Sequence, residues 1–207
     1  MSEVCAHLHL FVRDLKRHRF PFEKRKVPGS GIYLLFERGE TGHGGERIVR
    51  AGTHTGVDNL CARLYEHFLT ENKDRSIFRK HIGRALLTRD ADSFLSSWNI
   101  DLTKRTNRER YGASIDLDYQ ARIEAVVSDY IRENFSFVVF EAKDKEERLA
   151  LESKLISTLS LCDECHASES WLGHHAPHPK IRTSGLWLVN HLYKTPATVE
   201  DIAALRD

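Results

Sequence analysis

The segment 31–56, GIYLLFERGETGHGGERIVRAGTHTG, contains two strand-like runs that organise the rest of the chain. Residues 31–37 and 47–53 are rich in β-branched and aromatic residues, and a glycine-rich stretch that lacks phosphate-loop spacing separates them. This pattern predicts a hairpin with a mobile connection. Side chains alternate along a strand, so Tyr33 opposes the face of Ile32, and Arg50 opposes the face of Val49. In a paired hairpin, Tyr33 and Arg50 are expected to share a face.

Apolar spacing elsewhere indicates helices around a further strand. Helical periodicity covers residues 58–70, about 75–88, 117–133 and 144–160, and Ser2 caps a helix that ends before the FPF and VPGSG breaks. FSFVVFEA reads as a strand that is apolar on both faces and lies between helices. The polar stretch 90–114 predicts a long loop. These elements indicate one domain of α/β or α+β type.

Composition narrows the choice of function. The chain has 207 residues, 41% of them apolar, and 31 Lys+Arg against 30 Asp+Glu, so any basic surface must be local. The sequence has no 18-residue apolar run and no export signal, which predicts a cytoplasmic protein without a membrane anchor. Residues 13–26 carry seven Lys or Arg against two acids. Lys24, Arg25 and Lys26 in this arm either contact phosphates or form a solvated surface.

The helix expected at 58–70 has an apolar stripe bordered by two polar residues. Leu60, Leu64 and Phe68 form the stripe, and Arg63 and His67, four residues apart, lie along its edge. An Arg offers a fork of donors for phosphate oxygens, and a His transfers protons near neutral pH. The alternative is that both side chains only extend along the helix surface into solvent.

Glu152 is the acidic residue that a purely structural interpretation explains least well. The helix at 144–160 has an apolar stripe, and the helical wheel sets Glu152 in its middle; the stripe comprises Leu149, Leu155, Ile156 and Leu159. A buried carboxylate needs a cation or a proton. We therefore expect Glu152 to bind a divalent metal, to pair with Arg63, or both.

The segment 162–178, CDECHASESWLGHHAPH, offers a rival metal site. Cys162 and Cys165 form a C-x-x-C pair, and His174 or His178 could complete a zinc site, with His175 and His166 as further donors. The spacing differs from that of a standard zinc finger, and the alternative is that these histidines line the mouth of a cleft. Downstream, Lys180 and Arg182 are candidates for contact with a nucleic-acid backbone or are surface cations.

Four short motifs follow one another in order: GIY at 31–33, RAGT at 50–53, NLCARLYEH at 59–67 and LESKLI at 151–156. This ordered set resembles the GIY-YIG nuclease superfamily over residues 30 to 160. The flanking sequences are more similar to its restriction-enzyme-type members. The resemblance implies an α+β fold with a small mixed or antiparallel sheet of about three strands flanked by helices. Residues 30–192 would form this domain, preceded by a helix and basic arm at 1–29 and followed by a tail at 193–207.

The resemblance also implies roles for individual residues. Tyr33 corresponds to the tyrosine at the cut phosphate, Arg63 to the arginine that steadies the transition state, and Glu152 to the ligand of one Mg²⁺ or Mn²⁺ ion. His67 matches a histidine present in some members. The chain departs from the pattern where Arg50 replaces the second tyrosine. No asparagine follows Glu152 at the usual distance, and Asn190 lies much further along.

The function expected from these observations is a metal-dependent endonuclease acting on double-stranded DNA, in restriction or another defence role. The alternative is a nucleic-acid-binding module that has the same fold, with or without a stabilising zinc ion. In this module the replacement of the second tyrosine by Arg50 would have abolished catalysis. A palindromic target would imply a homodimer.

Overall fold

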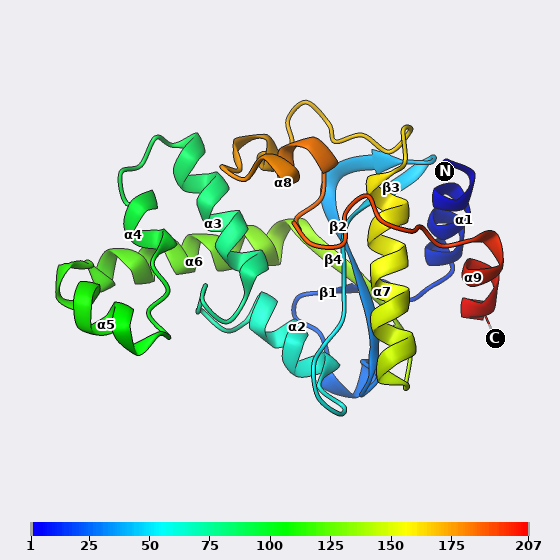
Figure 1. Ribbon diagram of the computed structural model, residues 1–207, viewed down its shortest axis with the longest axis horizontal. Helices are drawn as coiled ribbons and strands as arrows, with labels where there is room; N and C mark the ends of the chain where they lie inside the picture. Colours follow the sequence, from blue (N-terminus) through cyan, green and yellow to red (C-terminus); the bar gives the residue numbers. More distant parts are fainter. Residues whose placement is uncertain (1, 207) are drawn as a thin grey trace.

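The computed structural model describes residues 2–206 and contains one antiparallel sheet (Figure 1). Its strands lie in the order β1-β4-β2-β3; their bounds are His18–Arg19 for β1, Gly31–Gly42 for β2, Gly45–Gly52 for β3 and Phe135–Glu141 for β4. The predicted hairpin and the predicted strand within 135–142 are confirmed. The sheet has four strands instead of about three because residues 18–19 pair with β4 along its outer edge.

Helices cover both faces of this sheet. One face packs on α1 (Ser2–Arg13), α7 (Lys145–Ser160) and α9 (Val199–Ala203), which share an apolar cluster with Ile32 and Leu34. The other face packs on α2 (Leu60–Phe68), α3 (Ile77–Arg89) and α6 (Leu117–Asn134). Figure 1 shows α7 running along the sheet, with α1 and α9 beyond it. The α+β class expected from the sequence is confirmed.

Local sequence explains where the helices begin. The Ser76 hydroxyl accepts from Arg79 N at 3.3 Å and caps α3. Asp116 and Asp144 cap α6 and α7 in the same way, each accepting a backbone N–H at 2.8 Å. A side-chain oxygen at these positions satisfies a donor that the first helical turn leaves without a partner.

The prediction of a long loop at 90–114 was wrong. This stretch contains α4 (Leu95–Asn99), α5 (Arg105–Tyr111) and the short 3-10 turn Gly112–Ser114. Trp98 is fully buried, and its Nε1–H donates to the Lys80 carbonyl at 3.1 Å. Its ring lies directly against Gly83, where any side chain would overlap it. One buried aromatic side chain therefore fixes a segment whose polar composition suggested irregular structure.

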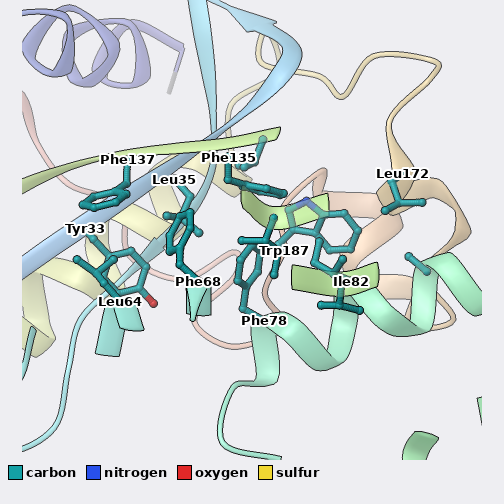
Figure 2. Close-up of a cluster of buried hydrophobic side chains, with 14 of the residues drawn as sticks. Tyr33, Leu35, Leu64, Phe68, Phe78, Ile82, Phe135, Phe137, Leu172 and Trp187 are labelled. Carbon is teal, nitrogen blue, oxygen red and sulfur yellow. The ribbon is translucent and has the colours of Figure 1, made fainter. Parts of the chain in front are cut away.

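The cluster on the α2–α3 side of the sheet extends from the hairpin to the C-terminal third of the chain. Figure 2 shows Tyr33 near one end of this cluster and Leu172 near the other, with Phe78 and Trp187 between them. The C-terminal third contributes α8 (Pro179–Ser184) and the 3-10 turn Leu172–His175; two further 3-10 turns are Lys24–Lys26 and Ala204–Arg206. None of the helices within residues 2–206 has the length and apolar character needed to cross a membrane.

A buried carboxylate fastens the C-terminal segment to the hairpin. Glu37 on β2 accepts hydrogen bonds from Nε1 of Trp171 at 2.8 Å and from Nε1 of Trp187 at 2.7 Å. The Tyr130 hydroxyl donates to the same carboxylate at 2.5 Å. Burial raises the pKa of Glu37, and these three donors partly offset that effect. The network holds residues 186–191 beside β3, where they contribute to the candidate site.

Candidate active site

The hairpin places Tyr33 and Arg50 on one face, as predicted. Tyr33 pairs with Gly52 and Leu35 pairs with Arg50, and directly opposed residues of an antiparallel pair project to the same side. The expectation that Arg50 opposes Val49 was wrong, because the register shifts between Leu35 and Phe36, so that Val49 is an extra residue. Val49 packs in the Tyr33 cluster. This β-bulge places the consecutive side chains of Val49 and Arg50 on the same side of the sheet, where Val49 packs in the core and Arg50 lines the candidate site.

Gly52 makes room for the tyrosine. A Cβ atom at Gly52 would overlap the hydroxyl oxygen and Cζ of Tyr33, so the Tyr33 ring crosses this position in contact with the backbone. The next residue, Thr53, links three elements. Its hydroxyl donates to the Gly31 carbonyl at 2.8 Å, and its N–H donates to Oε1 of Glu152 at 3.0 Å. The RAGT motif thus joins β2, β3 and α7 by contacts of residues 52 and 53.

Helix α2 packs as the sequence predicts and brings His67 to Tyr33. Leu60, Leu64 and Phe68 are fully buried. The Tyr33 hydroxyl and Nε2 of His67 are hydrogen bonded at 2.8 Å, and Nδ1 of His67 lies 2.8 Å from Oγ of Ser76. His67 is therefore not at the helix edge but inside the core.

The environment of His67 keeps its ring neutral. Burial lowers the pKa of His67 well below the usual value, and the nearby guanidinium groups of Arg63, Arg50 and Arg79 lower it further. The Ser76 hydroxyl accepts the Arg79 N–H and also contacts Nδ1. With Nδ1–H donating to Ser76, Nε2 is free to accept the Tyr33 hydroxyl proton.

Arg63 lies at the border of the core and faces a cavity. Its Nη1 donates to Oε2 of Glu66 at 2.7 Å and to the Arg75 carbonyl at 3.1 Å. Burial acts to lower the pKa of Arg63, but Tyr33 and Glu66 outweigh it and raise the pKa. The predicted pairing of Arg63 with Glu152 does not occur, because among residues 2–206 the ion pair of Arg63 within 4.0 Å is with Glu66.

Glu152 borders two cavities. One, of about 380 Å³, is lined by Glu152 with Arg63, Thr53 and His54; the other, of about 240 Å³, is lined by Glu152 with Arg50, His81, Asn190 and His191. Glu152 is half-buried, and the stripe around it is narrower than predicted because Leu149 is 40% exposed. Burial raises the pKa of Glu152, against the lowering effects of Arg50 and of the Thr53 N–H. Tyr33 and His67 do not contribute to either cavity wall.

Arg50 is held by the C-terminal segment. Its Nη1 donates to the Trp187 carbonyl, and its guanidinium carbon lies 5.4 Å from the centre of the Phe78 ring. Its Nε is buried and has no hydrogen-bond partner within the described part of the chain. A buried donor without a partner is costly, so Arg50 is prepared for an acceptor in the cavity.

Sequence reasoning missed several residues of the site. Asn190 lines the Arg50 cavity although it lies 38 positions after Glu152, and His191 contacts Oγ of Ser153 through Nδ1 at 3.0 Å. Only the folding of residues 186–191 beside β3 brings these two side chains to the site. Ser76 carried a detectable signal, since a serine before an apolar helix is a typical cap.

The basic candidates lie on the surface, and Arg25, Lys26, Lys180 and Arg182 have partners within the protein. Arg25 donates to Glu23 at 2.7 Å and Lys26 also pairs with Glu23, while Lys24 is exposed. Arg182 donates to the Ala176 carbonyl at 2.6 Å, and Lys180 donates to the Val189 carbonyl at 3.4 Å beside the Arg50 cavity. Contact of these residues with nucleic acid stays a prediction.

The predicted combination of zinc ligands is not the one that the structure assembles. Nε2 of His174 contacts the Ser168 carbonyl at 2.8 Å, and His178 caps α8 by accepting from Lys180 N at 3.2 Å. Within residues 2–206, the group of ligand atoms close enough to share an ion comprises Cys5, His9, His43 and Cys165. Cys162 lies next to this group, with Sγ 3.2 Å from Nε2 of His43.

Comparison with known proteins gave one family match. A family model described as GIY-YIG domain matches residues 6–204, which is nearly the whole chain. Comparisons with curated proteins and with solved structures gave no match. The match begins within α1 and ends at the start of the last 3-10 turn. It therefore includes most of α1 and all of α9, as well as the sheet and the helices between them.

Proposed function

The chain belongs to the GIY-YIG family and has its nuclease-type fold, and we propose that it is a metal-dependent endonuclease that hydrolyses phosphodiester bonds of double-stranded DNA. The observation that carries the proposal is the position of Glu152. Its carboxylate borders one cavity with Arg50 and a second cavity with Arg63. A phosphate between two guanidinium groups, beside an acidic residue, is the arrangement that phosphoryl transfer requires.

The two arginines would bind the phosphate. Arg50 has an unpartnered buried Nε, and Arg63 makes its hydrogen bonds to Glu66 and Arg75 through Nη1 within the described residues. Both side chains therefore retain donors for non-bridging oxygens. Because their positions are fixed by Trp187 and Glu66, little reorganisation is needed when negative charge develops in the transition state.

Tyr33 and His67 would move the proton of the attacking water. In the free protein the Tyr33 hydroxyl lies outside both cavity walls, so DNA binding must first open a path to it. The hydroxyl would then accept the water's proton while its own proton passes to Nε2 of His67, 2.8 Å away. The cations around His67 oppose this transfer in the free protein. A bound phosphate between Arg50 and Arg63 would offset those cations and raise the proton affinity of His67. In this sequence of transfers Tyr33 is the general base that accepts the water's proton, and His67 accepts the proton of the Tyr33 hydroxyl.

The donor set at Glu152 fits a divalent metal ion. Among residues 2–206, Glu152 makes no ion pair within 4.0 Å, and its carboxylate accepts the Thr53 N–H through Oε1. The Asn190 amide in the same cavity adds a neutral oxygen. Oxygen ligands of this kind suit Mg²⁺ or Mn²⁺. When bound, the ion would neutralise charge on the leaving oxygen.

Cleavage of supercoiled plasmid in Mg²⁺, Mn²⁺ or EDTA tests the proposal. We expect nicked or linear product with either metal, none in EDTA, and none from Glu152→Gln at an unchanged melting temperature. Glu146→Gln, an exposed change on the same helix, is the matched control and should cut normally. A Glu152→Gln variant that melts lower yet cuts at the natural rate would show that Glu152 is only a structural residue.

The same assay separates catalysis from binding. If the natural protein shifts DNA in a gel but never cuts it with either metal, the chain is a binding module. The first explanation to test for the missing cleavage is then Arg50 in place of a tyrosine. A restriction or other defence role is proposed from the sequence resemblance. Analytical ultracentrifugation with and without DNA tests whether the protein acts as a homodimer.

A further inference from the structure

A second group of metal-binding side chains lies away from the candidate active site. The ligand atoms of Cys5, His9, His43 and Cys165 all lie within 4.8 Å of one another, and Cys5, His9 and Cys165 are buried. We propose that these four residues bind one Zn²⁺ ion that stabilises the fold. The site is distinct from the Mg²⁺ or Mn²⁺ site at Glu152.

Helix α1 supplies two of the ligands in a preformed arrangement. Cys5 and His9 are four residues apart, so they project from the same face of the helix. Nδ1 of His9 lies 2.9 Å from the Cys5 carbonyl oxygen, and Nε2 lies 3.7 Å from Sγ of Cys165. With Nδ1–H donating to that carbonyl, Nε2 faces the Cys165 thiol as a ligand, and the Cys5 thiol lies 3.6 Å from Nδ1. A hydrogen bond from Nδ1–H to a carbonyl is the usual support of a metal-bound histidine. The weak bond from Ile48 N to Nε2, at 3.3 Å, would be exchanged for the ion.

The tip of the β2–β3 hairpin supplies the third ligand. His43 has a φ of 48°, a conformation that is unfavourable for a residue with a side chain, and Gly44 has a φ of 71°. This tight turn directs the His43 ring to the thiols, with its centre 5.0 Å from that of His9. Nδ1 of His43 lies 3.8 Å from the Glu164 carboxylate, which would orient the ring as carboxylates do behind zinc-bound histidines. The glycine-rich stretch, expected to be a separate connection, is itself part of the hairpin, since Gly39 and Gly42 lie in β2 and Gly45 lies in β3.

Cys165 supplies the fourth ligand from the segment that follows α7. It packs so closely under the hairpin that a Cβ at Gly42 would lie 2.7 Å from its Sγ. Two thiolates and two imidazoles are a tetrahedral donor set for zinc, in which neighbouring ligand atoms lie about 3.3–3.8 Å apart. Only a small contraction of the group would reach these distances. Four protein ligands leave no position open for substrate, so the role of the ion is structural.

The position of the group supports that role. It joins α1, the hairpin tip and the segment after α7, which are far apart in the sequence. The hairpin tip, where Gly42 pairs with Gly45, is the opposite end of these strands from the pair Tyr33–Gly52. Loss of the ion should therefore affect stability before it affects the arrangement of the catalytic residues.

Metal analysis of the full-length protein tests the proposal. After purification under reducing conditions without added metal, we expect about one zinc per chain by elemental analysis. Replacement of the zinc by Co²⁺ should give the visible absorption of a tetrahedral site with thiolate-to-metal charge-transfer bands. Cys165→Ser should lose the metal, whereas Cys61→Ser on α2 is the matched control and should keep it. Removal of the zinc by a chelator should lower the melting temperature by several degrees.

Two further variants keep the test decisive if Cys165→Ser fails to fold. His43→Ala, at the tip of the hairpin, should fold and release zinc at least tenfold faster to a chromogenic chelator. Cys162→Ser should retain the stoichiometry. Reduced natural protein that holds no zinc and shows no tetrahedral Co²⁺ spectrum would overturn the proposal, as would a Cys5–Cys165 disulfide in the protein isolated with thiol-blocking reagent. Loss of zinc from Cys162→Ser alone would overturn the assigned ligands.

Discussion

The hydroxyl oxygen of Tyr33 on β2 lies 2.8 Å from Nε2 of His67 on α2, and this contact joins a central strand of the sheet to the core side of the helix. Both side chains are almost completely buried. Their hydrogen bond continues through Nδ1 to Oγ of Ser76 at the start of α3. A tyrosine that would be a surface residue in an ordinary hairpin is thus coupled to two helices by this chain of polar contacts as well as by its packing in the core.

Tyr33→Phe removes the hydroxyl that we propose as the base. We expect the cleavage rate to fall by about 10²- to 10⁴-fold, the usual contribution of a positioned proton acceptor. Nε2 of His67 then loses its partner, at a cost of about 1–3 kcal/mol of unfolding free energy. Plasmid cleavage and chemical denaturation of the same preparation measure both effects. Tyr193→Phe, an exposed tyrosine, is the control, and equal rates for the two variants would exclude Tyr33 from the chemistry.

Gly52→Ala tests the contact between the hairpin backbone and the tyrosine ring. The added methyl group overlaps the Tyr33 hydroxyl, so Tyr33 must move away from His67. We expect cleavage to fall by at least tenfold, since catalytic groups act only in a narrow range of positions. Gly112→Ala, where no atom lies within 4 Å, should be neutral. Normal activity of Gly52→Ala would mean that the position of Tyr33 is not critical.

Arg50 replaces the tyrosine that the family motif places at this position. If Arg50 holds a phosphate oxygen, Arg50→Ala should cut far more slowly, while Arg50→Lys keeps part of the rate because it retains charge but loses the fork of donors. Cleavage rates measured at saturating DNA decide this. A large gain of activity in Arg50→Tyr would instead show that Arg50 has impaired catalysis at this site.

The basic turn at residues 24–26 allows a test with two sets of variants that should change DNA affinity in opposite directions. Replacing Lys24, Arg25 and Lys26 by Ala should weaken DNA binding and reduce the salt slope of the binding constant by about 0.9 for each lost phosphate contact. Glu23→Ala should strengthen binding, because Glu23 pairs with Arg25 and Lys26 in the free protein. Titrations at several salt concentrations measure both. Unchanged slopes in both variants would make this turn a solvated surface.

His81 predicts how stability depends on pH. Burial, together with the nearby charges of Arg84, Arg50, His178 and Lys80, lowers the pKa of His81 to about 3. Between pH 6.5 and about 3 the unfolded chain binds a proton at this residue and the folded chain does not. Stability should therefore decrease as the pH falls through this window, by up to about 1.4 kcal/mol per pH unit.

Urea unfolding at several pH values measures this dependence. His81→Asn should make the decline shallower, whereas His175→Asn, at an exposed position, should leave it unchanged. Parallel declines in His81→Asn and the natural protein would show that His81 is not responsible. His67 contributes in the same direction, because its pKa is also lowered.

The sequence was informative where local patterns determine structure. The alternation in residues 31–37, the helical stripe around Leu64 and the strand FSFVVFEA all correspond to elements of the fold. The shared face of Tyr33 and Arg50 was also predictable, although the bulge at Val49 was not. A bulge depends on the pairing of two strands, and alternation within one strand contains no sign of it.

Features that depend on long-range packing could not be predicted. Asn190 reaches the cavity of Glu152 only because Glu37 binds the two tryptophans that hold the C-terminal segment. Cys165 meets Cys5 and His9 only because α1 packs beside α7. The signals present were the C-x-x-x-H spacing in the first helix and the C-x-x-C pair, but nothing in the sequence connects them to each other.

The packing of α1 has a consequence for synthesis of the protein. Its apolar residues Leu8 and Phe11 are covered by β2, α7 and α9, and α9 begins at Val199. At about 5–20 residues per second, a ribosome needs roughly 10 to 40 seconds to pass from the first helix to the last. During that interval β2 and then α7 become available to cover α1, but the part of its apolar face that α9 covers stays exposed. That part is exposed for longer than the apolar face of a helix that packs on its immediate neighbour in the sequence.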